Sequence, residues 1–105
     1  MSSFFELYDL RVTVDEIRGR SVCGLNVGDY FEITESNQLR IPDNKHFCFY
    51  AVNSVIPFIA AKQRELTDND WLAQDSHIVC PDPEEQLIMK IERIGKQILD
   101  SEELT

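Results

Sequence analysis

The chain has 105 residues, and its 10 Lys and Arg against 19 Asp and Glu give a formal net charge of −9. This negative charge repels nucleic-acid phosphates and anionic lipids, and the basic residues are scattered, so we expect no nucleic-acid binding and no membrane binding. A hydrophobic content of 43% is typical of a globular protein rather than a disordered chain. No apolar run approaches the roughly 20 residues of a membrane span, and the N-terminus does not read as a signal peptide. We therefore expect a cytoplasmic protein.

The first part of the chain predicts three strands. Residues 8–15 alternate between apolar and polar side chains, as in a strand with one buried face, and Ile17 falls out of this alternation. Three glycines make residues 19–28 a loop. Residues 30–34 and 38–41 then read as two short strands with a turn between them.

The most apolar stretch, residues 47–61, predicts the main helix. Its apolar side chains recur at helical spacing on nearly every side, so we expect a helix that is buried almost all round, with Asp43 available to cap its start. Pro57 lies inside this stretch, where a proline removes a hydrogen bond and clashes with the preceding turn. The helix should therefore be kinked there, or break near residues 53–54 and restart.

The last part of the chain predicts a loop and two more strands. Residues 62–76 are polar, and the apolar pair Trp71-Leu72 is expected to pin this loop to the core. Residues 77–80 read as a short strand that ends at a rigid Pro-Asp-Pro turn. Residues 87–94 alternate again as a strand, although a helix over residues 84–99 also fits.

This order of elements predicts an α+β fold. We expect a small, mostly antiparallel sheet of about five strands, packed on one main apolar helix that is interrupted by proline. A single domain should cover residues 1–96, and residues 97–105 should form an acidic, flexible C-terminal tail.

Three cysteines, Cys23, Cys48 and Cys80, form the first candidate site. Their odd number and the absence of a leader favour reduced thiols. The glycine loop, the helix start and a strand end that carry them could converge, and three thiolates with His46 or His77 as a fourth ligand would suit zinc. If no fourth protein ligand is present, the three thiolates with one open coordination position would suit an iron–sulfur cluster. No two cysteines share a local chelating motif, so buried thiols without a ligand are the alternative.

A small thiol-dependent enzyme is another alternative. Cys80 has His77 three residues away, but on a strand these side chains point to opposite faces. Cys48 lies near a helix N-terminus, which favours a thiolate, among apolar neighbours that indicate burial. No catalytic residue is assigned on these grounds. Ordinary turn chemistry explains the acidic residues of the loops and strand ends, which are Asp9, Asp15, Glu16, Asp29 and Asp82.

The aromatic residues point to a protein partner. A 105-residue chain has a small core, which cannot readily bury Phe47, Phe49, Tyr50, Phe58 and Trp71 at once. Any that stay exposed would form an association surface. We therefore expect a small accessory protein or small subunit that associates with itself or with a larger enzyme, and we leave open whether it has an activity of its own.

The sequence resembles a family of small bacterial and archaeal proteins of unknown function. The resemblance covers residues 8–94 and rests on Tyr8-Asp9-Leu10-x-Val12-x-Val14, Cys23 before Gly28-Asp29, Cys48 before the apolar stretch with Pro57, and Cys80-Pro81-Asp82-Pro83. This chain differs from the family in a longer acidic C-terminus and in Asn26, where the family has a histidine. The resemblance draws attention to the three cysteines and implies no particular reaction.

Overall fold

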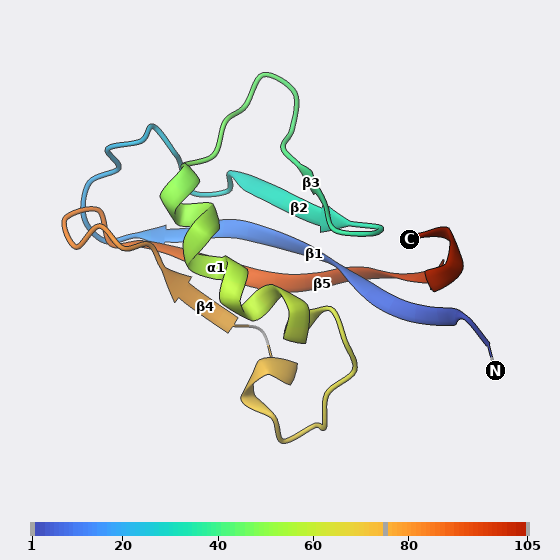
Figure 1. The fold of residues 1–105 in the computed structure, drawn as a ribbon. Helices are drawn as coiled ribbons and strands as arrows, with labels where there is room; N and C mark the ends of the chain where they lie inside the picture. Colours follow the sequence, from blue (N-terminus) through green and yellow to red (C-terminus); the bar gives the residue numbers. More distant parts are fainter. Residues whose placement is uncertain (1, 75, 105) are drawn as a thin grey trace.

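The computed structural model describes residues 2–74 and 76–104, and these residues contain one sheet and one α-helix (Figure 1). The elements in chain order are β1 (Phe4–Ile17), β2 (Tyr30–Thr34), β3 (Gln38–Arg40), α1 (Phe49–Lys62), η1 (Trp71–Ala73), β4 (Ser76–Val79), β5 (Leu87–Asp100) and η2 (Ser101–Glu103). The sheet is antiparallel throughout, with the strand order β3-β2-β1-β5-β4. The predicted α+β fold is confirmed.

The two long strands β1 and β5 form the centre of the sheet. They pair from Phe4 opposite Asp100 to Ile17 opposite Leu87, so β1 extends the predicted strand in both directions. The apolar side chains of the alternating stretch 8–15 do point into the core. A register irregularity follows Val14 and shifts the pairing by one residue, which explains why Ile17 falls out of the alternation.

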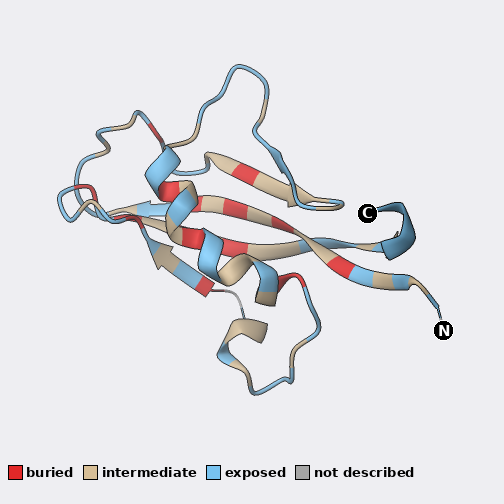
Figure 2. Cartoon of the chain, in the orientation of Figure 1, coloured by how far each residue is buried: buried red, intermediate tan, exposed pale blue. Residues whose placement is uncertain are grey.

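The core lies between the central strands and the inner side of α1. Figure 2 shows the buried residues in the middle of β1 and β5 and along one side of the helix. Phe31 of β2 is fully buried, and its ring meets that of Phe47 edge-on with 4.7 Å between the centroids. Ala51 and Val55 are the apolar residues of α1 that are fully buried against the sheet.

The helix differs from the prediction in three respects. It begins at Phe49 after the cap residue Cys48, so Asp43 does not cap it. Of the two alternatives expected at Pro57, a kink or a break near residues 53–54, the break does not occur, because one helix runs through Pro57. Since Pro57 is exposed, water can solvate the carbonyl group that loses its hydrogen bond. The prediction of all-round burial is wrong, because the sheet covers only one side of α1. Six of the 14 residues of the helix are exposed.

The C-terminal part of the chain differs from expectation in its strand and in its tail. Of the two alternatives for residues 84–99, the helix does not form, since residues 87–100 belong to β5. The segment 97–105, expected as a tail, therefore begins inside a strand. Thr105 lies outside the described residues, as does residue 75 of the predicted polar loop.

Of the apolar pair expected to pin the loop after α1, Leu72 is half-buried, whereas Trp71 is 63% exposed. The Trp71 ring lies at a steep angle to that of Phe58, with 6.1 Å between the centroids. Trp71 is therefore not buried in the core.

Beyond the five-stranded part of the sheet, β1 and β5 continue as a two-stranded ribbon, in which Leu7 is still buried. β2 pairs with residues 10–13 of β1, and β4 pairs with residues 88–91 of β5. The segments 4–9 and 95–100 therefore pair with each other and with no further strand of the described chain. We call these segments the ribbon; it projects from the sheet together with both ends of the chain (Figure 1).

Candidate functional site

The solvent side of α1, whose residues are all described, carries no charged side chain. Its exposed residues are Phe49, Tyr50, Asn53, Ile56, Pro57 and Ala60. They recur at helical spacing because the intervening positions pack toward the sheet. Phe49, Tyr50 and Ile56 are 78%, 68% and 55% exposed, and the two rings meet edge-on with 5.9 Å between their centroids. We call these six residues the helix face.

Beside the start of α1 lies a pocket that gathers all three cysteines. Its volume is about 280 Å³, and its lining residues are Val22, Cys23, Cys48, Tyr50, Cys80, Pro81, Asp82 and Glu85. The glycine loop, the helix start and the end of β4 thus bring the three cysteines to one pocket. Tyr50 belongs both to this pocket and to the helix face, so the two surfaces are continuous.

Glu85 holds two of the cysteines together. Its side chain is buried, and the residue is only 2% exposed. The Val22 amide donates a hydrogen bond to Oε2 at 2.8 Å, the Cys23 thiol donates to the same oxygen at 3.4 Å, and the Cys80 thiol donates to Oε1 at 3.2 Å. We call Cys23, Cys48, Cys80 and Glu85 the thiol cluster. The sequence analysis missed Glu85, and no sequence signal distinguishes it from its exposed neighbour Glu84.

The environment keeps two of the thiols protonated. Burial, helped by the hydrogen bond to Glu85 and by the nearby Cys48, raises the pKa of Cys23 to about 11. Burial is also the main cause that raises the pKa of Cys80. Burial alone would raise the pKa of Glu85 as well, but hydrogen bonds from the Val22 amide and from both thiols outweigh it and lower that pKa. At neutral pH, Glu85 is ionised, whereas Cys23 and Cys80 are thiols and hence weak nucleophiles.

The two histidines lie outside the thiol pocket. His46 Nε2 lies 2.7 Å from the backbone oxygen of Cys23, and His77 Nε2 lies 3.3 Å from a carboxylate oxygen of Asp15. Neither histidine lines the pocket. Among residues 2–74 and 76–104, no group of three or more His, Cys, Asp or Glu side chains has, as it stands, an arrangement that could hold a metal ion.

The acidic residues assigned to turn chemistry divide into three groups. Asp29 and Asp82 each accept a hydrogen bond from a backbone amide two or three residues away, as predicted. Asp9 instead joins separate elements, because its two oxygens accept from the amide of residue 35 and from the side chain of residue 97. Glu16 lies in an exposed ion pair with Arg18, and Asp15 lies 3.3 Å from the exposed His77 ring.

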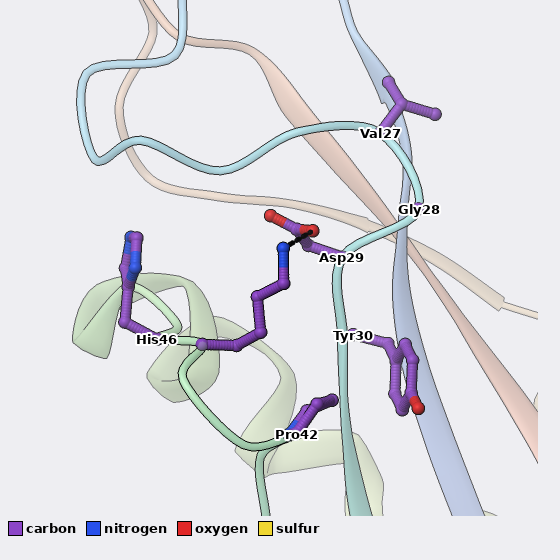
Figure 3. Close-up of a pocket in the computed structure, with 7 residues that line it drawn as sticks. Val27, Gly28, Asp29, Tyr30, Pro42 and His46 are labelled. Carbon is purple, nitrogen blue, oxygen red and sulfur yellow. Dashed lines mark ion pairs between the residues drawn. The ribbon is translucent and has the colours of Figure 1, made fainter.

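A second pocket lies between the glycine loop and the segment before α1 (Figure 3). Its volume is about 380 Å³, and it is lined by Val27, Gly28, Asp29, Tyr30, Pro42, Lys45 and His46. The Lys45 ammonium lies 3.9 Å from an oxygen of Asp29, and Figure 3 shows this ion pair across the pocket. Because these two charges offset each other and the lysine is exposed, we assign this pocket no function.

Comparisons with known proteins identify no relative. No protein-family model matches the chain, and no curated protein or solved structure matches it. The resemblance to the small bacterial and archaeal proteins therefore stays a prediction. In the described part of the chain, no helix combines the length and the apolar character needed to cross a membrane.

Proposed function

We propose that this protein is a small subunit that associates with another protein chain through the helix face. The observation that carries the proposal is that all six exposed residues along the solvent side of α1 are uncharged and two of them are aromatic. A surface helix of a soluble protein normally presents charged and polar side chains to water. The centres of protein interfaces are instead poor in charge and rich in aromatic residues.

The partner we propose is a second copy of the chain. The chain has a net charge of −9, so two copies repel each other over most of their surfaces. The helix face adds nothing to this repulsion, because none of its six residues is charged, so two copies would meet there rather than on a charged surface. A two-fold arrangement would place the same face on both copies and would bury Phe49 and Ile56 of each.

The test is the mass of the protein in solution, measured by sedimentation equilibrium. We expect a dimer for the wild type. In Phe49→Lys and Ile56→Lys, we expect dimerisation at least about tenfold weaker, because each dimer would then bury unpaired charges. Both side chains are exposed, so these changes should leave the fold intact. Ile98→Lys, at an exposed position of the ribbon, is the matched control and should dimerise like the wild type.

A monomeric wild type would contradict self-association. The alternative partner, a larger enzyme, would then be sought by co-purification with a tagged form of this protein. A specific partner should be retained by the wild type and by Ile98→Lys, and lost by Ile56→Lys.

A further inference from the structure

We propose that the thiol cluster binds one zinc ion or a similar thiophilic divalent ion, with Cys23, Cys48, Cys80 and Glu85 as its ligands. The proposal does not depend on association through the helix face.

The donor set suits this class of ion. Zinc prefers four ligands in a tetrahedron, drawn from cysteine sulfur, histidine nitrogen and carboxylate oxygen. Sulfur donors favour zinc over magnesium or calcium, which prefer oxygen ligands. The cluster supplies three sulfurs and one carboxylate from three separate segments of the chain. Glu85 thus takes the position for which the sequence suggested His46 or His77.

Two distances within the cluster, from Glu85 to Cys23 and to Cys80, are close to those that a metal site requires, and Cys48 lines the same pocket. With a Zn–S bond of about 2.3 Å and a Zn–O bond of about 2.0 Å, a tetrahedral ion places sulfur and oxygen about 3.5 Å apart. The corresponding distances from Glu85 are 3.4 Å to the Cys23 sulfur and 3.2 Å to the Cys80 sulfur. Replacing the thiol protons by an ion would change these distances by only a few tenths of an ångström.

The cluster needs a small rearrangement to surround a single ion. The two sulfurs contact different oxygens of Glu85, in keeping with the absence of a preformed metal arrangement among the described residues. Rotation of the carboxylate and of the cysteine side chains about χ1 would bring the donors to one point. The pocket of about 280 Å³ that they line leaves room for this movement.

Glu85 lies at the centre of the cluster. The Val22 amide and the Cys23 and Cys80 thiols all donate hydrogen bonds to its carboxylate. A buried carboxylate held between two cysteine sulfurs is placed to join them as a ligand of one ion. On binding, three S–H bonds are exchanged for three metal–sulfur bonds, three protons pass to solvent, and no electrons are transferred.

The test is titration of the reduced, metal-free protein with Co²⁺, which absorbs in the near ultraviolet when thiolates bind it. We expect one ion per chain by native mass spectrometry, a sulfur-to-cobalt absorption band, and displacement of cobalt by Zn²⁺. Cys23→Ser and Cys80→Ser should lower the affinity at least 100-fold and weaken the band. Glu85→Gln should lower the affinity by about 10- to 100-fold and retain the band, because all three sulfurs remain.

Two matched variants serve as controls. Glu84→Gln removes a neighbouring exposed carboxylate, and His77→Ala removes a histidine outside the pocket; both should bind cobalt like the wild type. If a cysteine variant fails to fold, as judged by circular dichroism, the wild-type titration and Glu85→Gln decide the question. No absorption band in the wild type, or an unchanged affinity in Glu85→Gln, would overturn the proposed site.

Discussion

At the scale of single residues, the Cys23 thiol links stability to alkaline pH. Its pKa in the folded chain is about 11, above its ordinary value of 9.0, and the pKa of Cys80 is raised as well. As the pH rises, the thiols therefore lose their protons at a lower pH in the unfolded chain than in the folded chain. The contribution of the Cys23 thiol to the stability of the fold is fully present below pH 9.0 and is lost as the pH rises through 11. We expect Cys23 to account for a loss of at most about 3 kcal/mol over this range.

Urea unfolding of the reduced, metal-free protein at several alkaline pH values measures this loss. Cys23→Ala should show a shallower decline than the wild type, because it has one ionisable thiol fewer. Equal slopes for the two proteins would contradict the raised pKa.

Glu85 should contribute to stability even without a metal ion. Glu85→Gln preserves the size of the side chain but replaces one acceptor oxygen by an NH₂ group, which cannot accept a hydrogen bond from the Val22 amide or from a thiol. We expect the free energy of unfolding to fall by about 1–3 kcal/mol, the cost of an unsatisfied buried donor. The exposed neighbour provides the control, since Glu84→Gln should change stability by less than about 0.5 kcal/mol. Similar values for both variants would show that Glu85 is not held as described.

The cysteines could be found from the sequence, whereas Glu85 could not. Cysteine is rare and chemically distinctive, so its three positions attract attention wherever they lie. Glu84 and Glu85 are chemically identical neighbours, and only the backbone decides which of them is buried. That backbone is fixed by distant residues, since the amides of residues 18–20 donate hydrogen bonds to the carbonyl groups of residues 84–86.

Gly19 is the point at which these two segments come closest. A Cβ atom at this position would lie 1.9 Å from the carbonyl oxygen of Glu84, a distance that forces the segments apart. We expect Gly19→Ala to lower the free energy of unfolding by at least about 2 kcal/mol. It should also weaken cobalt binding, because it displaces the segment that carries Glu85. Gly95→Ala is the control, since its Cβ would make an ordinary contact of 3.6 Å; an equal loss in both variants would contradict this assignment.

At the scale of elements, the sequence predicted the strands better than the helix. Alternation along β1 directly reflects burial of one face, so residues 8–15 sufficed to find that strand. The apolar residues of α1 gave no comparable guidance, because a residue such as Phe49 is equally apolar whether it faces the sheet or water. The ribbon was missed because the pairing of residues 97–100 with the start of the chain is not a local property.

Pro57 should cost α1 part of its stability. A proline inside a helix removes one backbone hydrogen bond and crowds the preceding turn, which together cost about 3 kcal/mol. Because Pro57 is exposed, Pro57→Ala should raise the free energy of unfolding by about 1–3 kcal/mol. The measurement is urea unfolding in the Ile56→Lys background, with and without the change, at a protein concentration at which sedimentation gives the mass of a monomer, so that association does not contribute. An unchanged or lower stability would show that the helix already accommodates the ring without cost.

At the scale of the whole molecule, the ribbon makes the protein elongated. The radius of gyration is 14.9 Å and the principal extents are 51 × 35 × 19 Å, whereas a compact chain of this length has a radius of gyration of about 13 Å. Side-chain contacts hold β5, at and just before the ribbon, to the end of α1 and the loop after it. Arg93 donates to the carbonyl groups of Lys62 and Arg64, and Lys96 forms an ion pair with Glu65. Lys96 also pairs with Glu6 on the opposite strand of the ribbon.

Native-state hydrogen exchange should show that the ribbon opens independently of the core. Two strands without further neighbours are only marginally stable, so we expect hydrogen-bonded amides of residues 4–7 and 97–100 to exchange at least about 30-fold faster than those of residues 10–14 and 88–91. The comparison is made in the monomeric variant Ile56→Lys and in the wild type. Equal protection of ribbon and core in the monomer would contradict the prediction. Protection that appears only in the wild type would show that the partner copy covers the ribbon as well as the helix face.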